Sequence, residues 1–127
     1  MMKILLVDDN AINRMVATHL LQFLKCDVEC AVNGEEAVTA VATKQYDLVL
    51  MDCHMPTMDG LTATERIRER EKALGIRRLP IIALTANDAP GSRELCFGAG
   101  MDDFLSKPLI PGDLEGVIAK WSVRHAG

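Results

Sequence analysis

The chain has 127 residues, of which 49% are hydrophobic and 25% are charged, and its formal net charge is −4. This length and composition fit one globular domain with its own core, and the weak acidity does not favour binding to nucleic acid or to an anionic membrane. The four cysteines lack the spacing of zinc ligands, and no apolar run reaches the length of a membrane span.

Short aliphatic runs recur along the chain. They are continuous instead of alternating, which is typical of strands that are buried on both faces of a parallel sheet. The second run is the most polar of them and favours an edge strand. In chain order, the predicted strands are Ile4–Val7, Val28–Val32, Leu48–Met51, Ile81–Leu84 and Phe104–Leu105.

Segments with helical spacing of apolar residues follow the predicted strands. Asn10 is placed to cap the first of these helices. The charged run Arg66–Lys72 is interpreted as a solvated helix face with local ion pairs, and Trp121 as the core anchor of the last helix. The residues that mark the helices are Ile12, Met15, Val16, Leu20 and Phe23; Ala37, Val38 and Val41; Ala63 and Ile67; Leu95 and Ala99; and Leu114, Val117, Ile118 and Trp121.

Strict alternation of strand and helix predicts an α/β fold with right-handed crossovers and helices on both faces of a parallel sheet. In such folds ligands bind beyond the carboxyl ends of the strands. The residues at those ends are therefore expected to meet at one edge: Asp8 and Asp9, Asp52, Thr85 and Ala86, and Ser106 with Lys107 and Pro108.

Three carboxylates at one edge repel each other, and a bound cation relieves that repulsion. Oxygen ligands select Mg²⁺, Mn²⁺ or Ca²⁺, and Mg²⁺ in particular also binds substrate phosphate. Lys107 would add a positive charge, Thr85 a hydroxyl and Ala86 a backbone N–H, while a carboxylate can act as the nucleophile in phosphoryl transfer. Each residue alone has an ordinary explanation, such as a helix cap, and only their combination indicates a site.

These blocks resemble the response-regulator receiver family. The likeness extends from about Lys3 to Trp121 and implies a flavodoxin-like, doubly wound (βα)5 fold with strand order 2-1-3-4-5. It implies one receiver domain over residues 1–127, with a core over residues 3–122. The matching segments are Leu6–Asn10, Met51–Gly60, Ala83–Ala86 and Lys107–Pro108.

The resemblance also implies roles for the site residues. Asp52 would be phosphorylated, and Lys107, joined to Pro108 by a cis bond, would pair with the phosphoryl group. Thr85 and Phe104 would move in a conformational switch. Mg²⁺, with Mn²⁺ as an alternative, would be ligated directly by Asp9, Asp52 and the backbone carbonyl of His54, and through water by Asp8.

A narrower likeness, in Asp8–Arg14, Ile82–Asn87 and Gly100–Pro108, is to receivers of hybrid sensor histidine kinases. It implies a histidine kinase core or a histidine-phosphotransfer domain as partner, and no independent enzyme activity beyond the domain's own phosphorylation and dephosphorylation. No targeting segment is visible, so we expect a cytoplasmic chain with reduced thiols, in isolation or as the cytosolic module of a membrane-bound kinase. We expect a monomer or weak dimer that contacts neither nucleic acid nor membrane.

Three alternatives remain open at this point. A phosphatase of the haloacid dehalogenase type would carry an Asp-x-Asp motif after its first strand, whereas this chain has Asp8-Asp9 there. A flavodoxin would need a hydroxyl-rich phosphate loop at the same place. A degenerate receiver that only binds partners would not be expected to keep the acids, Thr85 and Lys107.

Overall fold

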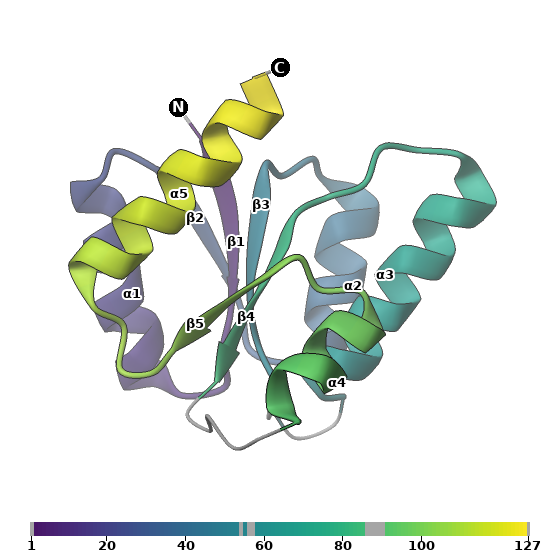
Figure 1. Cartoon of the computed structure of the whole chain (residues 1–127), viewed down its shortest axis with the longest axis horizontal. Helices are drawn as coiled ribbons and strands as arrows, with labels where there is room; N and C mark the ends of the chain where they lie inside the picture. Colours follow the sequence, from purple (N-terminus) through teal and green to yellow (C-terminus); the bar gives the residue numbers. More distant parts are fainter. Residues whose placement is uncertain (1, 54, 56–57, 86–90, 127) are drawn as a thin grey trace.

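The computed structural model describes residues 2–53, 55, 58–85 and 91–126, in which strands and helices alternate along the chain (Figure 1). No helix in these ranges is both long and apolar enough to cross a membrane. The elements are β1 (Lys3–Val7), α1 (Ala11–Phe23), β2 (Asp27–Ala31), α2 (Gly34–Thr43), β3 (Leu48–Asp52), α3 (Gly60–Leu74), β4 (Ile81–Thr85), α4 (Ser92–Ala99), β5 (Asp103–Ser106) and α5 (Pro111–Ala126).

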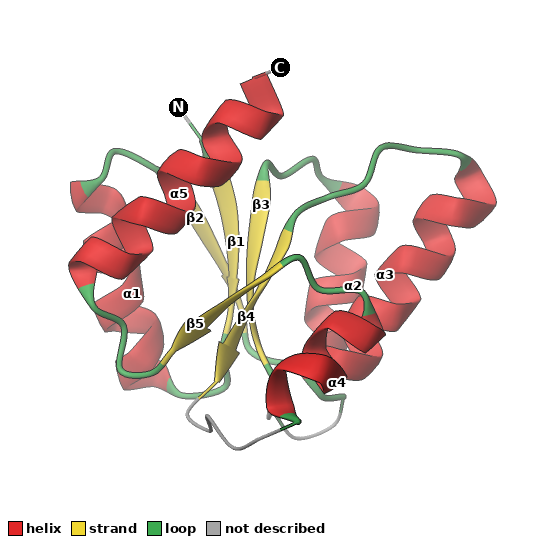
Figure 2. Cartoon of the chain, viewed as in Figure 1, coloured by secondary structure: helices red, strands yellow, loops and turns green. Residues whose placement is uncertain are grey.

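The strands form one parallel sheet in the order β2-β1-β3-β4-β5. Helices α1 and α5 cover one face of the sheet, and α2, α3 and α4 cover the other (Figure 2). The predicted flavodoxin-like, doubly wound α/β architecture and its strand order are therefore confirmed.

Successive residues of the central strands point into two separate cores. Leu5 and Val7 belong to the core beneath α2 and α3, whereas Ile4 and Leu6 belong to the core beneath α1 and α5. All four side chains are buried. Burial on both faces explains why these strands read as continuous aliphatic runs. Trp121 is buried in the second core, as predicted.

Helix α1 forms as predicted, but four of the five apolar residues that mark it do not face the sheet. Asn10 does cap the helix, because its side chain accepts a hydrogen bond from the Asn13 backbone N–H at 3.0 Å. The buried residues of α1 are nevertheless Ala17 and Leu21. The helix carries two apolar stripes, and spacing alone cannot say which one faces the sheet. The other stripe is exposed: Ile12 (67%), Met15 (56%), Val16 (47%) and Phe23 (85%).

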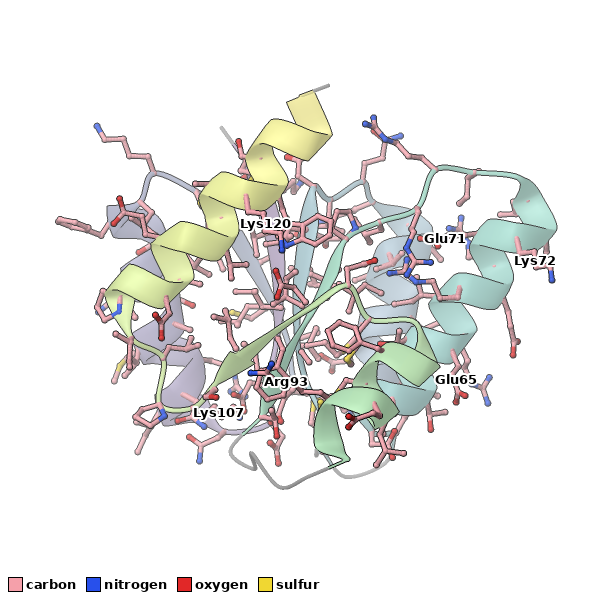
Figure 3. All side chains as sticks on the ribbon, in the orientation of Figure 1. Glu65, Glu71, Lys72, Arg93, Lys107 and Lys120 are labelled. Atoms are coloured by element: carbon pink, nitrogen blue, oxygen red, sulfur yellow. The ribbon has the colours of Figure 1, made fainter. Side chains whose placement is uncertain are left out.

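The interpretation of Arg66–Lys72 as a solvated face is wrong for two of its residues. The Arg68 guanidinium donates to Asp102 at 2.6 Å, to Glu71 at 2.9 Å and to the Gly100 carbonyl at 2.8 Å. Glu71 is buried and also accepts from the Leu79 backbone N–H. This network lies at the opposite end of the sheet from Lys107 (Figure 3).

Tyr46 gives the fold a testable response to alkali. Its hydroxyl donates to Glu29 at 2.7 Å, and burial followed by this bond raises the pKa of Tyr46 from 10.0 to about 12. The unfolded chain therefore ionises first, so the free energy of unfolding should fall as pH rises through this window. Urea unfolding is measured at pH values between 10.0 and about 12. Over this range the free energy of unfolding of wild type should fall by about 2 kcal/mol more than that of Tyr46→Phe. Equal losses would contradict this assignment.

Candidate functional site

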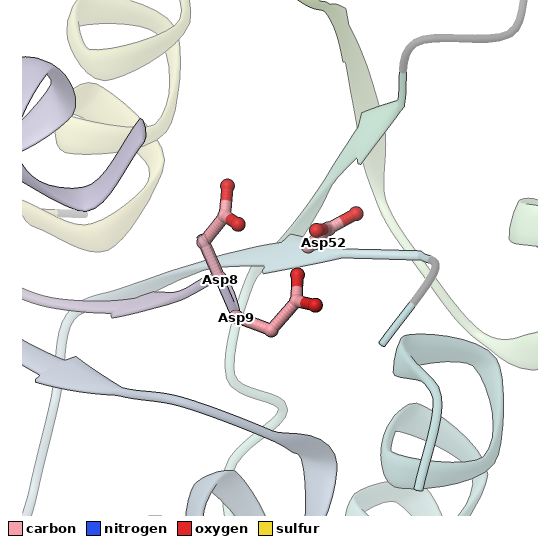
Figure 4. Close-up of side chains that lie close together, drawn as sticks. All are labelled: Asp8, Asp9 and Asp52. Carbon is pink, nitrogen blue, oxygen red and sulfur yellow. The ribbon is translucent and has the colours of Figure 1, made fainter. Parts of the chain in front are cut away.

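Three carboxylates gather where β1 and β3 end. Asp8 and Asp9 follow β1 and Asp52 is the last residue of β3, and the two strands are paired in parallel with Val7 opposite Met51. One oxygen of each carboxylate lies within 4.8 Å of the others (Figure 4). Asp8 and Asp52 are buried, with 2% and 4% exposed, whereas Asp9 faces solvent.

Lys107, which follows β5, inserts between two of these acids. Its Nζ lies 3.0 Å from an oxygen of Asp8 and 3.0 Å from an oxygen of Asp52. Burial lowers the pKa of Lys107, but the bonds to both carboxylates and their charges outweigh it, so the pKa is raised overall. The lysine therefore stays protonated at neutral pH. Its bond to Pro108 is cis, as the resemblance implied.

The donor set fits a hard divalent cation. Three carboxylates and one ammonium leave two negative charges among these four side chains, and a divalent ion would neutralise them. Oxygen donors and one solvent-facing ligand suit Mg²⁺, which keeps part of its water shell. Asp8, Asp9 and Asp52 are the residues that would hold it. The His54 carbonyl, the fourth ligand in our prediction, lies outside the described residues.

Two strand-end residues from the prediction lie on β4 and β5. Thr85 ends β4, is buried, and stands in register with Ser106. Because Leu84 pairs with Asp52 on the neighbouring strand, Thr85 is placed at the same edge as the acids. Its neighbour Ala86 lies outside the described residues. Phe104 is half-buried on β5, and its switch role stays a prediction.

Gly60 allows α3 to begin directly against the phosphoacceptor candidate. A Cβ at this position would lie 2.1 Å from the Asp52 backbone oxygen, which is far inside contact distance. The Gly60 backbone N–H also donates to the Cys53 carbonyl at 3.2 Å. This close approach fixes the backbone that presents Asp52, and no larger residue fits there.

Sequence reasoning missed two arginines near the site. The Arg14 side chain donates to the Asp8 backbone carbonyl at 2.8 Å and holds the turn between β1 and α1. The Arg93 guanidinium lies 4.8 Å from the centre of the Phe104 ring. A helical position four residues beyond Asn10 could have pointed to Arg14, whereas the Arg93 contact depends on how α4 is oriented and leaves no local signal.

The family follows from a match to the model of the response regulator receiver domain, which covers residues 4–119. The chain belongs to this family. A solved receiver domain of the sensor histidine kinase PA1611 from Pseudomonas aeruginosa PAO1, with a magnesium ion coordinated in its active-site cleft, is 42% identical to this receiver. That match has a TM-score of 0.85 and covers 94% of this chain and 96% of the other.

Two further relatives connect this receiver to phosphorelays. A chain from the co-crystal structure of the Saccharomyces cerevisiae histidine phosphotransfer protein Ypd1 with the receiver domain of Ssk1 is 31% identical. It gives a TM-score of 0.93 and covers 99% of this receiver and 92% of that chain. Hybrid signal transduction histidine kinase L of Dictyostelium discoideum is 39% identical over 94% of this receiver. The receiver spans only 7% of that kinase, and the haloacid dehalogenase alternative finds no support in these matches.

Proposed function

We propose that this receiver accepts a phosphoryl group from a phosphohistidine onto Asp52, with Mg²⁺ held by Asp8, Asp9 and Asp52. The observation that carries the proposal is the pair of buried carboxylates bridged by Lys107 beside the exposed Asp9. The magnesium ion in the cleft of the PA1611 receiver supports the choice of metal, with Mn²⁺ as the alternative.

In the proposed transfer, an Asp52 oxygen attacks phosphorus while the bond from phosphorus to the donor imidazole nitrogen breaks. The donor nitrogen keeps the electron pair of that bond and takes a proton from water, so neutral imidazole leaves and Asp52 becomes an acyl phosphate. Lys107 then exchanges its carboxylate contacts for a phosphoryl oxygen, and Thr85 supplies a hydroxyl to another. When bound, Mg²⁺ neutralises charge that develops on the phosphoryl oxygens. Ala86 and His54 keep their predicted backbone roles.

The proposed partner is a histidine kinase core or a histidine-phosphotransfer domain, as the Ypd1 complex and the hybrid kinase relative suggest. We propose that residues 1–127 form one cytoplasmic receiver domain that is monomeric or weakly dimeric. Its phosphorylation state would act as a signal, through a shift between two conformations that involves Thr85 and Phe104. We propose no enzyme activity beyond its own phosphorylation and dephosphorylation.

The first turns of the exposed stripe of α1, with Ile12, Met15 and Val16 but without Phe23, are the proposed docking surface for this partner. Ile12, Met15 and Val16 are spaced to lie on one side of the helix, and all three are exposed. The helix starts at Ala11, two residues after Asp9, so its first turns border the acid cluster. A partner must bring a histidine to Asp52 while excluding water, and a helical partner with an apolar face would bury this stripe.

Replacing Ile12 by glutamate should separate docking from chemistry. We expect the rate of transfer from a phosphorylated histidine-phosphotransfer protein to fall at least about tenfold, because the charge must be desolvated in the interface. The rate with acetyl phosphate, which needs no docking surface, should be unchanged. The matched control is Phe23→Glu, because Phe23 is 85% exposed on the same helix but about 16 Å further along it.

Each variant is mixed with the phosphorylated donor or with acetyl phosphate, and the reaction is quenched at timed intervals. The phosphate on each protein is then quantified, which gives the rate with each donor. Equal losses in Ile12→Glu and Phe23→Glu would place the docking surface elsewhere.

The function itself is tested by phosphoryl transfer from a phosphorylated histidine-phosphotransfer protein to wild type and to Asp52→Asn. Phosphate should leave the donor and appear on wild type only when Mg²⁺ is present, and Asp52→Asn should receive none. Circular dichroism should show that the variant keeps its fold. Transfer to folded Asp52→Asn at the wild-type rate would mean that Asp52 is not the acceptor.

A further inference from the structure

Two buried thiols lie in contact beside the candidate phosphoacceptor. The Sγ atoms of Cys53 and Cys96 are 3.4 Å apart, and the residues are 4% and 3% exposed. Cys53 follows Asp52 directly at the end of β3, whereas Cys96 lies in the middle of α4. The two cysteines are 43 positions apart in the sequence, so folding alone creates this juxtaposition.

We propose that Cys53 and Cys96 are an oxidation site, at which a peroxide joins them in a disulfide that tethers α4 to the end of β3. One thiol would be oxidised by hydrogen peroxide to a sulfenic acid, with release of water. The second thiol would attack that sulfur, and a second water would leave as the disulfide forms. The peroxide is reduced by two electrons, and both thiols together supply them.

Forming this bond requires a small local movement. The sulfur atoms must approach by about 1.4 Å, from 3.4 Å to a bond length of about 2 Å. By contrast, Cys26 is buried in the core on the other face of the sheet, and Cys30 is exposed on the edge strand. The structure therefore singles out one pair among the four free cysteines.

Helix α4 offers a route for the oxidant. Helix α4 has only eight residues and contains Gly98. Its N-cap residue is Gly91, which has no side chain that could accept a capping hydrogen bond. A helix this short without a cap is weak by itself. It also leaves Leu95 and Phe97 66% and 46% exposed, so it buries less apolar surface than its composition allows. Transient opening of α4 would uncover both thiols, which are otherwise protected by burial.

The tether would act on the neighbouring acid. Cys53 shares a peptide bond with Asp52, and its backbone N–H donates to the Leu84 carbonyl at 3.1 Å. A displacement of its side chain toward α4 is transmitted to the backbone that presents the Asp52 carboxylate. Small misplacements of a nucleophile are costly, so oxidation should slow phosphate uptake by about tenfold. This consequence rests on the proposed function, whereas formation of the disulfide does not.

The covalent claim is tested by treating the native chain with hydrogen peroxide, blocking the remaining thiols with a maleimide under denaturing conditions, and measuring its mass. We expect two blocked thiols instead of four, a loss of two hydrogen atoms, and a linked Cys53–Cys96 peptide after digestion. Cys96→Ala and Cys53→Ala should each abolish the link. Cys26→Ala and Cys30→Ala are the matched controls and should retain it.

A link that involves Cys26 or Cys30, or retention of all the Cys53 and Cys96 thiols, would overturn the proposal. A Cys53–Cys96 link that forms only in urea would overturn the proposal equally, since the folded chain would then not make it.

A second experiment compares the rates at which acetyl phosphate phosphorylates the oxidised protein and the re-reduced protein. In wild type, reduction should restore the rate of phosphorylation. In Cys96→Ala, oxidation should leave that rate unchanged. If reduced protein takes up no phosphate, the proposed function fails while the mapped disulfide stands.

Discussion

Replacing Lys107 by alanine should slow phosphorylation of the receiver by acetyl phosphate by about a hundredfold or more. The Lys107 ammonium lies 3.0 Å from oxygens of both Asp8 and Asp52, so it is already placed where a phosphoryl group on Asp52 would carry its charge. Because the variant keeps the three carboxylates, Mg²⁺ should still bind. Phosphate uptake is measured by intact mass over time, and metal binding by calorimetry.

The control for this variant is Lys120→Ala. Lys120 also pairs with a carboxylate, that of Asp103 at 3.3 Å, but it is 59% exposed and lies on α5. Its removal should leave the rate unchanged, since an exposed ion pair contributes little. A Lys107→Ala rate equal to that of wild type would contradict the role we assign to the lysine, and loss of Mg²⁺ binding would contradict the proposed ligand set.

Replacing Arg68 by methionine should lower the free energy of unfolding by about 3 kcal/mol, because it strips a buried cation from two acids. Arg68 is 13% exposed, and its partners Glu71 and Asp102 are 10% and 11% exposed in their side chains. Arg78 still reaches Asp102, but it is 57% exposed, and within the described residues it donates to Asp102 and the Gly100 carbonyl and not to Glu71. Urea unfolding at neutral pH measures the loss.

Arg66→Met provides the matched comparison, since Arg66 lies on the same helix and is exposed. Its unfolding free energy should stay within about 0.5 kcal/mol of wild type. Equal stabilities for the two variants would mean that the buried network contributes nothing. Phosphate uptake by folded Arg68→Met should remain near normal, because the network lies at the other end of the sheet from Lys107 (Figure 3).

Much of the fold was predictable because burial on both faces leaves a strong mark on a strand. The run Leu48–Met51 is aliphatic because its residues alternate between two cores, and each of them is fully buried. The strands at the sheet edges are more polar and less buried, and for β2 both predicted bounds shifted: it runs from Asp27 to Ala31 instead of Val28–Val32. The faces of the edge strands are less completely covered: β2 and β5 each bury one residue, whereas every residue of β3 and β4 is buried.

Two surfaces differ from what their local patterns suggest, and for the same reason: a local sequence pattern does not show which residues a helix face contacts in the folded chain. The stripe of Ile12 and Val16 reads like a core face, yet these side chains are exposed. Arg68 reads like a solvated residue, yet Asp102, 34 positions away, holds it in the protein. Both outcomes depend on long-range packing. An exposed apolar stripe next to a candidate site indicates an interaction surface, because contact with water does not favour apolar side chains.

The candidate site was the most predictable part of the molecule. Parallel strands bring their carboxyl ends to one edge, so Asp8, Asp52 and Lys107 could be brought together from element order alone. Their actual distances required the structure, as did the bridging position of the lysine. The contact of Arg93 with Phe104 was beyond sequence reasoning, because it depends on the tilt of a short helix.

The most direct test of the central claim is to locate the phosphate after incubation with acetyl phosphate. The chain is digested, and its peptides are examined by mass spectrometry, with Mg²⁺ present or removed by a chelator. We predict one phosphate per chain, on the peptide that contains Asp52, and none without the metal. Phosphate on any other residue, or equal labelling of Asp52 without a divalent cation, would contradict the account.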